Sequence, residues 1–424
     1  MSDYFHSVTL DKDECKGCIN CIKRCPTQAI RVRDGKAHII TELCIDCGEC
    51  IRVCPHHAKK AITDPLSIMD NYRYKVALTP PSLYGQFNNI EDPDLVFAAL
   101  KDIGFDEVFD VARAAELASD ATRRMLATGA MPSPVISSAC PAVLRLIRVR
   151  FPSLINRVQP LVAPVEIAAR MAKDEAEKRG LKREEVGCIF LTPCPAKVTA
   201  IRMPIGTATS DIDAAVAVKD VYPLLVGAMK HAKDEAERPQ SGRIGIGWAE
   251  SGGEAAGLLT TDAYLAADGI ENVIRVLEDL EDNKYANIEF VELDACSGGC
   301  VGGVLQVENP YIAKSKIKKL RRYMPVSMNH LEEDIPAHML WDTDLEYSPV
   351  MELGKTKQES FEKYAEFEDI MEKLPDLDCG SCGAPTCESF AEDVVRGNAV
   401  LGDCVVLMRK KMEAILKAAG LDGT

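Results

Sequence analysis

Short apolar runs alternate with longer helical stretches through the middle of the chain, from residue 74 to about residue 345. Runs typical of strands occur at residues 74–79, 108–111, 134–138, 186–191, 243–248 and 288–293. The stretches between them are rich in Ala, Glu, Lys and Arg, as in residues 165–179. Strands that alternate with helices predict parallel sheets whose faces are covered by helices.

The two ends of the chain follow different patterns. Residues 1–72 contain a cysteine pattern that repeats with an offset of 29 residues. After Pro349 the composition becomes helical and charged, and residues 361–374 are expected to form an amphipathic helix. A chain of 424 residues is long enough for this division into three domains, at residues 1–72, 73–345 and 346–424.

Charge and hydropathy narrow the class of protein. The formal net charge of −15 argues against nucleic acid or an anionic membrane as a partner. No run approaches the roughly 18 apolar residues that cross a bilayer. The N-terminal residues lack a basic region followed by an apolar core, so no signal peptide is evident and a cytoplasmic protein is expected.

The most informative feature of the composition is its 17 cysteines. In a reducing compartment, cysteines in this number are expected to be metal ligands rather than disulfides. All but one fall into clusters along the chain. The exception, Cys188, lies in an apolar run and is expected to be a small buried hydrophobic residue.

The N-terminal repeat has the spacing of a two-cluster ferredoxin. The motif C-x2-C-x2-C-x3-C-P occurs twice, with the cysteines Cys15, Cys18, Cys21, Cys25 and Cys44, Cys47, Cys50, Cys54. In this pattern the fourth cysteine of each run binds the other cluster. One 4Fe-4S cluster is therefore expected on Cys15, Cys18, Cys21 and Cys54, and the other on Cys44, Cys47, Cys50 and Cys25. Zinc also binds C-x2-C pairs and is the competing interpretation.

Four further cysteines follow the ends of predicted strands. Cys140 follows the strand at 134–138, Cys194 follows the strand at 186–191, and Cys296 and Cys300 follow the strand at 288–293. Ligands in parallel α/β folds collect beyond the carboxyl ends of the strands, so the four thiols could converge on one cluster. The alternative for residues 296–303 is a glycine-rich turn whose two thiols bind no metal.

The loops that carry these cysteines resemble the three signature loops of the FeFe-hydrogenases. The matching segments are Ser138-Ala-Cys140-Pro141, Thr192-Pro-Cys194-Pro-Ala-Lys197 and Ala295-Cys-Ser-Gly-Gly-Cys300-Val-Gly-Gly303. Their order and spacing also fit that family. The resemblance implies a ferredoxin-like domain, a two-lobed α/β catalytic domain with parallel sheets, and a small, mainly helical iron–sulfur domain, α+β overall.

The active site of that family is the H-cluster, a 4Fe-4S cubane joined by one thiolate to a diiron unit with CO, cyanide and a bridging azadithiolate. The resemblance implies that Cys140, Cys194, Cys296 and Cys300 hold the cubane, with Cys300 as the bridge. It also implies that Lys197 donates a charge-assisted hydrogen bond to a cyanide on the distal iron. Without the resemblance, Lys197 would be read as a surface lysine.

Other segments match the lining of the family's pocket. Pro80, Pro81 and Ser82 match the loop that lies against the dithiolate bridge. The segment Ser251-Gly252-Gly253-Glu254 resembles a Gly-Gly segment of the pocket wall, and Trp248 stands near where the family often has Phe.

The sequence departs from the family around the expected cluster. Ala139 stands where studied members have a cysteine that shuttles protons, and Asp294 stands where they have a methionine. Further departures are Thr192 for Met, Ala200 for an acidic residue, Pro164-Val165 for a Pro-Gln pair, and the lack of an insertion before the Gly-Gly segment. Loss of a relayed proton transfer predicts slow turnover, because such transfer contributes about 10²–10⁴-fold to a rate. Asp120, Glu116 and Asp294 are candidates for a substitute path; the alternative is that each is an ordinary surface or capping carboxylate.

The C-terminal segment contains a fourth set of cysteines, Cys379, Cys382, Cys387 and Cys404. Their spacing resembles the iron–sulfur domain of corrinoid iron–sulfur proteins and of some sensory hydrogenases. Four thiolates suit a 4Fe-4S cluster, although 2Fe-2S or zinc would also match the count. Residues 388–396 and 408–418 are expected to be helical.

The resemblance as a whole implies an anaerobic FeFe-hydrogenase that interconverts H2 with protons and electrons. It would carry three accessory 4Fe-4S clusters, exchange electrons with a ferredoxin-like or other redox protein, and depend on the enzymes that mature the diiron unit. One alternative is a hydrogen sensor that signals to a partner protein. The other is an iron–sulfur electron-transfer protein that lacks the diiron unit.

Overall fold

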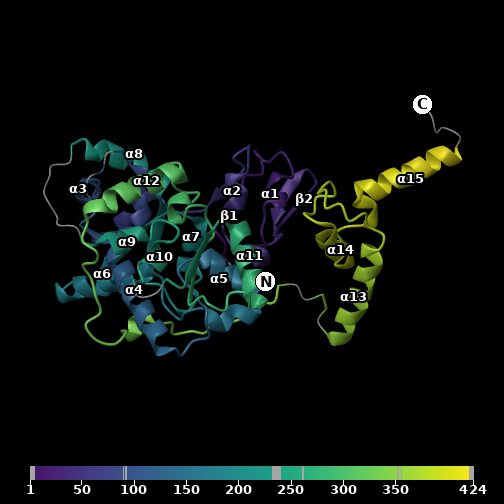
Figure 1. Ribbon diagram of the computed structural model, residues 1–424. Coiled ribbons are helices and arrows are strands. Elements are labelled where there is room, and N and C mark those ends of the chain that lie inside the picture. Colours follow the sequence, from purple (N-terminus) through teal and green to yellow (C-terminus); the bar gives the residue numbers. More distant parts are fainter. Residues whose placement is uncertain are drawn as a thin grey trace. The chain divides into compact units, whose positions relative to one another are not determined.

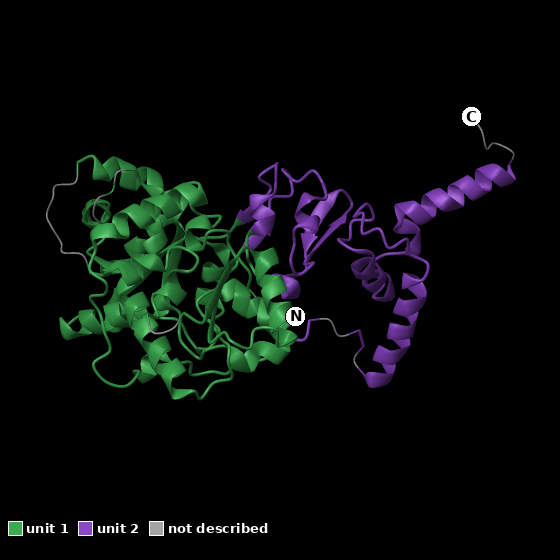
Figure 2. Ribbon diagram, in the orientation of Figure 1, with its two compact units in different colours: residues 1–7, 45–48, 61–347 green, residues 8–44, 49–60, 348–424 purple. Residues whose placement is uncertain are grey.

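The computed structural model describes residues 5–88, 90, 93–231, 240–259, 262–350, 353–354 and 356–419. Helices and strands divide into two compact units (Figures 1 and 2). Unit 1 contains residues 1–7, 45–48 and 61–347, and unit 2 contains residues 8–44, 49–60 and 348–424. The chain therefore passes between the two units within the N-terminal cysteine repeat, at residues 45–48.

The larger sheet of unit 1 has four parallel strands in the order β6-β5-β8-β9. Their bounds are β5 Tyr74–Thr79, β6 Glu107–Asp110, β8 Val186–Thr192 and β9 Ala214–Ala217. Successive side chains of β5 belong to different cores: Ala77 packs in one cluster, and Val76 and Leu78 pack in the other. This alternation is the period of a strand whose sheet is buried on both faces, as predicted from the apolar runs.

Helices cover both faces of this sheet. On the face of Val76 lie α4 (Val111–Thr128) and α6 (Pro164–Lys178), which pack against each other through alanines. On the face of Ala77 lie α3 (Asp94–Asp102) and α8 (Val218–Met229). Cys188 of β8 is fully buried under α6, as the sequence predicts.

A second parallel sheet, in the order β10-β11-β7, forms the other lobe of unit 1. Its strands are β7 Val135–Ile136, β10 Tyr264–Asp268 and β11 Phe290–Asp294. They share a core with α5 (Pro141–Arg150) and α11 (Ile270–Glu281). The remaining α-helices of unit 1 are α7 Pro195–Arg202, α9 Arg243–Gly247, α10 Gly253–Ala256 and α12 Pro310–Leu320.

The strand predicted at residues 243–248 is wrong, because the segment forms α9. A short apolar run has no period that distinguishes a strand from a buried helix. Gly245 explains why a helix fits: a Cβ there would lie 2.2 Å from the carbonyl oxygen of Ala112, so α9 packs backbone to backbone on α4. Strands β9 and β10 were missed by the sequence pattern.

A further boundary differs at β6, which was predicted to include Val111. The carboxylate of Asp110 accepts a hydrogen bond from the backbone N–H of Ala112 at 3.1 Å and caps α4. An aspartate cap stabilises the first turn of a helix, so Val111 begins α4 instead of ending the strand.

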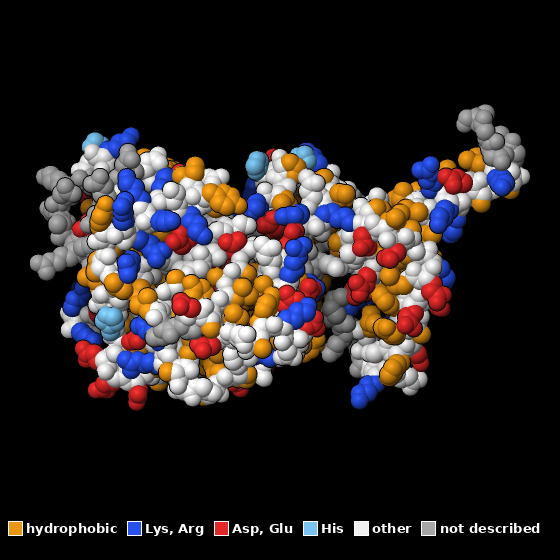
Figure 3. Space-filling model, in the orientation of Figure 1, with side chains coloured by type: hydrophobic (Ala, Val, Ile, Leu, Met, Phe, Trp, Pro, Cys, Tyr) orange, Lys and Arg blue, Asp and Glu red, His pale blue; other side chains and the backbone are white. Residues whose placement is uncertain are grey.

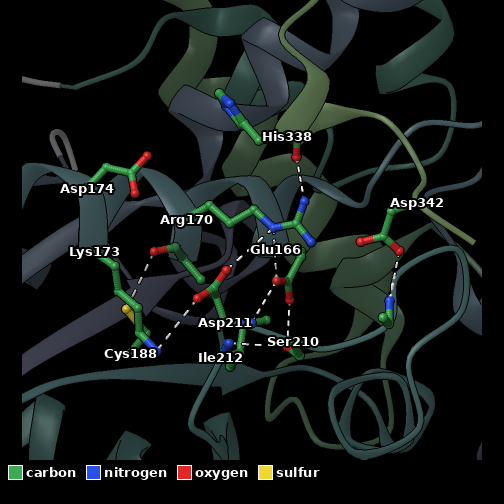
Figure 4. A network of polar contacts seen from close by, with 12 residues as sticks. Glu166, Arg170, Lys173, Asp174, Cys188, Ser210, Asp211, Ile212, His338 and Asp342 are labelled. Carbon is green, nitrogen blue, oxygen red and sulfur yellow. Dashed lines mark hydrogen bonds and ion pairs between the residues drawn. The ribbon is translucent and has the colours of Figure 1, made fainter. Parts of the chain in front are cut away.

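A network of polar side chains fixes α6 to the segment that enters β9 (Figure 4). Glu166 accepts hydrogen bonds from the Ser210 hydroxyl at 2.6 Å and from the Asp211 N–H at 2.7 Å. Lys173 lies 2.9 Å from the carboxylate of Asp213. These contacts hold the segment before the edge strand β9 against α6, the helix that begins at Pro164.

Unit 2 combines two small sheets with short helices. Strand β1 (Val8–Leu10) pairs with β4 (Lys59–Ala61), and β2 (Ile30–Arg33) pairs antiparallel with β3 (Lys36–Ile39). Its helices are α1 Asn20–Lys23, α2 Glu49–Arg52, α13 Lys357–Met371, α14 Cys387–Val395 and α15 Val405–Ala418. The three helices expected in the tail are confirmed, each beginning one to four residues earlier than predicted. Within the described ranges, no helix has the length and apolar character needed to cross a membrane.

Candidate active site

A cavity in unit 1 lies where the loops after four strands meet. Its wall includes residues that follow β5, β7, β8 and β11, so the carboxyl ends of strands from both sheets contribute. The predicted site residues that line it are Pro80, Pro81, Ser82, Ala139, Cys140, Lys197, Trp248, Glu254, Asp294 and Cys300. Ligand sites at the carboxyl ends of parallel strands are the general rule in α/β folds.

Three of the predicted ligand thiols surround the ammonium of Lys197. Burial disfavours the charge of Lys197, but its pKa is raised because the thiolates of Cys300, Cys194 and Cys140 lie close to it. Burial in turn raises the pKa of Cys300 to about 12, opposed by Lys197. The cavity therefore brings half-buried thiols close to a positive charge.

This donor set fits an iron–sulfur group. A buried thiol gives up its proton readily when a metal ion binds the sulfur, because the metal replaces the lost hydration of the thiolate. Among the described residues the ammonium of Lys197 has no hydrogen-bond partner, and Lys197 borders the cavity, where its ammonium can donate to an anionic group. The fourth predicted ligand, Cys296, begins the loop of Cys300, and its carbonyl accepts a hydrogen bond from the Gly299 N–H at 3.1 Å.

The glycines of this loop are required by close contacts between backbones. Gly299 has φ +89°, and a Cβ there would lie 2.4 Å from the nitrogen of Ser251. A Cβ at Gly303 would lie 2.2 Å from the carbonyl oxygen of Pro193, which precedes Cys194. The glycines thus let the Cys300 loop touch both the Cys194 loop and the Ser251 segment.

The loop after β5 is held in place by the loop that follows Gly303. Ser82 is fully buried, and its hydroxyl accepts a hydrogen bond from the side chain of Gln306 at 2.8 Å. Ser251 is not among the residues that line the cavity, and its N–H donates to the Gly298 carbonyl at 3.1 Å. Trp248 lines the cavity and its indole N–H donates to Ser119 at 2.9 Å.

Two of the three proton-path candidates are placed away from the cavity. Glu116 accepts hydrogen bonds from the N–H groups of Gly242, Met328 and Asn329 at 2.8–3.0 Å. Asp120 accepts from the Leu331 N–H at 2.9 Å and pairs with Arg123 at 3.0 Å. These contacts are those of capping carboxylates, the alternative that the sequence left open, whereas Asp294 borders the cavity.

Two glutamates of the cavity wall are buried, Glu292 and Glu254, and the sequence pattern indicated no role for Glu292. Glu292 precedes Asp294 by two residues on β11 and hydrogen-bonds to it. Burial raises the pKa of Glu292 well above its usual range, and it accepts hydrogen bonds from the Gly252 and Ala255 N–H groups at 2.9 and 2.8 Å. The period of a strand, which puts residues i and i+2 on one face, was the signal that could have found Glu292.

Glu254 lies on the same wall and reaches the loop of Cys140. Burial raises its pKa to about 8, and its carboxylate accepts a hydrogen bond from the Ser137 hydroxyl at 2.7 Å. The same hydroxyl accepts a hydrogen bond from the Ala139 N–H at 3.1 Å. The sequence had placed Glu254 only as the end of a Gly-Gly segment.

In unit 2 the first predicted ferredoxin-type site comes together from both halves of the repeat. The pKa of Cys21 is raised by burial and by the nearby thiols of Cys18, Cys54 and Cys15. These four cysteines are the set expected when the fourth ligand is exchanged between motifs. Of the other set, Cys25, Cys44 and Cys50 pack in the core of unit 2.

Cys47 belongs to unit 1, where it packs against the same core as Cys140 and Cys194. Its neighbour Asp46 is fixed to α7, the helix after Cys194, by a hydrogen bond from the Thr199 hydroxyl at 2.8 Å. A Cβ at Gly48 would lie 2.6 Å from the side chain of Val304. One predicted ligand of the ferredoxin-type repeat is thereby anchored beside the loops of the cavity.

The tail cysteines also gather at one place in unit 2. Cys382 has its pKa raised by burial and by the thiols of Cys404 and Cys379, and Cys387 is buried in the same apolar cluster. Gly380 and Gly383 on either side of Cys382 have φ of +77° and +82°. Such backbone turns leave room for a group bound by surrounding thiolates.

Comparisons with known protein families match all three parts of the chain. A model of the iron-only hydrogenase large subunit, C-terminal domain, matches residues 73–264 and 255–304, more than half of the chain. A 4Fe-4S dicluster domain matches residues 7–55, and an iron–sulfur cluster domain matches residues 374–406. The predicted domain types are therefore confirmed.

Individual relatives agree with the family match. The chain is 25% identical over 392 residues to iron hydrogenase 1 of Clostridium pasteurianum, covering 74% of this chain and 68% of that protein. It is 21% identical over 379 residues to the NADP-reducing hydrogenase subunit HndD of Solidesulfovibrio fructosivorans, covering 71% of this chain and 64% of that one. The chain thus spans about two thirds of the length of these relatives.

The fold agrees with solved FeFe-hydrogenases. The structure of HydA1 from Chlamydomonas reinhardtii superposes with a TM-score of 0.52 at 18% identity, covering 65% of this chain and 95% of that one. At this identity the likeness concerns the fold alone. With the family match over residues 73–304 and iron–sulfur domains on both sides, the chain belongs to the iron-only (FeFe) hydrogenase family.

Proposed function

We propose that this protein interconverts H2 with two protons and two electrons at an H-cluster in the cavity of unit 1, with slow turnover. The observation that carries the proposal is the convergence of Cys140, Cys194 and Cys300 around Lys197 at the meeting point of the strand ends. A structural zinc site is closed by its four protein ligands and would not use the open cavity that Lys197 borders.

The residues of the cavity have distinct tasks in this proposal. The four cysteines would hold the H-cluster, which supplies the hydrogen chemistry itself. Lys197 would donate to an anionic ligand of the cluster, and Pro81 and Ser82 would shape the wall against it. Apolar neighbours such as Val111, Ala115 and Phe190 exclude water from this wall.

Ala139 is the reason to expect slow turnover. It lines the cavity, and a methyl group can neither donate nor accept a proton. Hydrogen bonds link Ala139 to two groups that can hold a proton: the Ser137 hydroxyl accepts from the Ala139 N–H and donates to Glu254. A carboxyl with a pKa of about 8 holds a proton at neutral pH and could exchange it with the cavity through the Ser137 hydroxyl.

Infrared spectroscopy and hydrogen evolution on the matured protein test the proposal together. We expect CO and cyanide bands, with slow hydrogen evolution in the wild type. The variant Ala139→Cys should raise the rate at least about tenfold, because it restores a proton donor at the wall. Ala139→Val is the matched control, since it adds a similar volume without a proton. Absence of the CO and cyanide bands would reject the proposal and leave the electron-transfer interpretation.

A hydrogen sensor is a second candidate, favoured by Ala139 at the cavity together with an additional cysteine site in the tail. A sensor needs to bind hydrogen but gains nothing from rapid turnover. Infrared bands that shift under H2, combined with turnover that Ala139→Cys does not increase, would favour this role over the enzyme.

A further inference from the structure

The tail cysteine site is the most open of the predicted iron–sulfur sites. All 17 cysteines lie in the described part of the chain, and Cys379 alone among them is exposed. An exposed ligand residue brings this site to the surface, where another molecule can approach it.

The tail site is joined to the ferredoxin-like part of unit 2 by direct backbone contact. The Val32 N–H of β2 donates to the Gly383 carbonyl at 2.7 Å. The guanidinium of Arg33 donates to the Cys382 carbonyl, also at 2.7 Å. A Cβ at Gly383 would lie 1.9 Å from the Val32 carbonyl oxygen, so the tail loop lies on β2 with no side chain between them.

A buried ion-pair cluster locks this contact. The carboxylate of Asp393, on α14, accepts hydrogen bonds from Arg31 and Arg33 of β2, each at 2.7 Å. Arg31 and Asp393 are 6% and 5% exposed, so the charges are neutralised away from water. Such a clamp costs desolvation energy and fixes one relative position of its two elements.

From β2 the hydrogen-bonded backbone continues to the first ferredoxin-type site. Val32 of β2 is paired with Ala37 of β3. The Ala37 N–H donates to the thiol sulfur of Cys15 at 3.5 Å. The pairing of β2 with β3 therefore joins the strand that contacts the Cys382 loop to the strand that contacts Cys15.

The helix that leaves the tail site is strongly basic, in a chain of net charge −15. Helix α15 begins directly after Cys404, and basic side chains lie along it (Figure 3). Arg409, Lys410, Lys411 and Lys417 are exposed on it, with Glu413 as its one carboxylate. A positive element beside the open site would attract an acidic protein and raise its rate of association.

We propose that the tail cysteine site is the port where this protein exchanges single electrons with an acidic carrier protein, and that β2 and β3 connect the port to the Cys15 site. In one direction the reduced carrier loses one electron and the iron–sulfur centres of this chain gain it. No bond is formed or broken and no proton moves. The inference deepens the proposed function by assigning its electron partner, but it is measured on the iron–sulfur centres and not on hydrogen.

Charge reversal on α15 tests the port in the full-length protein with its clusters. The probe is a reduced acidic ferredoxin, and stopped-flow absorbance under argon follows electron transfer to this protein. Lys410→Glu combined with Lys411→Glu should lower the second-order rate constant at least about tenfold at low salt, with the difference shrinking as salt is added. The matched control reverses Lys318 and Lys319, an exposed basic pair on α12 of unit 1.

The proposal is overturned if the variant with reversed Lys318 and Lys319 transfers electrons as slowly as the α15 variant. It is also overturned if the wild type and both variants show equal rates. Methyl viologen radical, a small cation, should reduce the wild type and the α15 variant at rates within about twofold, which shows that the clusters remain intact. Slower reduction by methyl viologen would instead attribute the α15 effect to damaged centres and overturn the assignment.

Electron paramagnetic resonance tests the connection to the Cys15 site. A variant with Cys379→Ser and Cys382→Ser removes the tail centre, and Cys188→Ala, a buried thiol outside the sites, is the control. In the reduced protein, loss of a neighbouring spin should lower the half-saturation power of the remaining iron–sulfur signal at least threefold. An unchanged value in the double variant would show that the tail centre does not interact with the ferredoxin-type sites.

Discussion

The cavity of unit 1 and the cysteine sites of unit 2 stabilise thiolates in different ways. In unit 1, burial raises the pKa of Cys140, Cys194 and Cys300, and the charge of Lys197 is the main influence against it. In unit 2, the pKa of Cys54 is lowered in spite of burial, because backbone N–H groups of Lys59, His56 and Ala58 point at its sulfur. In unit 1 the charge of one lysine, three residues after Cys194, acts on three thiols, whereas Cys54 in unit 2 relies on the N–H groups of its own loop.

The difference follows from how far apart the ligands lie in the sequence. A loop of a few residues can turn its own N–H groups toward a thiol, and the short cysteine spacings of unit 2 provide such loops. Cys140 and Cys300 follow strands that are far apart in the chain but neighbours in the second sheet, so only the fold brings their thiols to one cavity. There a single buried cation has to compensate several thiolates.

The largest expected effect is in unit 2 and concerns its ion-pair clamp. Asp393→Ala should lower the free energy of unfolding of unit 2 by about 3–5 kcal/mol, because it leaves the buried Arg31 and the half-buried Arg33 without their counter-charge. Glu388→Ala, an exposed acidic residue on the same helix, should change it by less than about 0.5 kcal/mol. Denaturant unfolding followed by iron–sulfur absorbance gives both values, and equal effects would show that the clamp does not hold the tail.

The counterpart in unit 1 is the charge of Lys197. Lys197→Met should lower hydrogen turnover by about 10²–10³-fold, the usual loss when a preorganised donor is removed from a site. The iron–sulfur signals of unit 2 should remain, because their thiolates are stabilised by backbone N–H groups. Lys219→Met, on the exposed side of α8, is the control. If Lys197→Met also abolished the iron–sulfur signals of unit 2, the two kinds of site would not be stabilised in different ways.

The contact between ligand loops gives a smaller effect. Gly303→Ala should destabilise unit 1 by about 1–3 kcal/mol, since the new methyl group would overlap the Pro193 carbonyl. Gly227→Ala, in α8 with open space around it, should be neutral or stabilising by up to about 1 kcal/mol. Thermal unfolding of the two variants under argon measures the difference. A Gly303 variant as stable as the control would mean that the loops can separate freely.

The smallest expected effect is the pH dependence due to Glu254. Its pKa is raised to about 8 in the folded protein by burial, above the value of about 4.3 expected for an unfolded chain. Between these two pH values the folded state keeps Glu254 protonated while the unfolded chain loses that proton. The stability that protonated Glu254 contributes is therefore complete below about pH 4.3 and is lost as the pH rises through about 8. Glu254→Gln should flatten the fall in stability between pH 6 and pH 9, measured by denaturant unfolding in a pH series. An unchanged slope would show that Glu254 is ionised in the folded protein.

Much of the fold could be predicted from patterns of short range. Strand β5 begins and ends at the predicted residues, β8 differs by one residue at one end, and α6 differs by one residue at each end. The errors fall where a short segment has no period of its own, as in α9, or where a strand is as brief as β9. In both cases contacts with distant elements decide the conformation, and no local pattern contains them.

The sequence by itself determined which residues could be metal ligands, because the spacing of Cys15, Cys18 and Cys21 is a property of the local chain. It also determined the glycine positions of the Cys300 loop. Only the tertiary structure decided that Lys197 lies among three thiols, that Glu254 reaches the loop of Ala139 through Ser137, and that Glu116 is a cap. These relations join residues separated by tens to hundreds of positions, and packing fixes them because buried charges and hydrogen-bonding groups must find partners wherever the fold brings them.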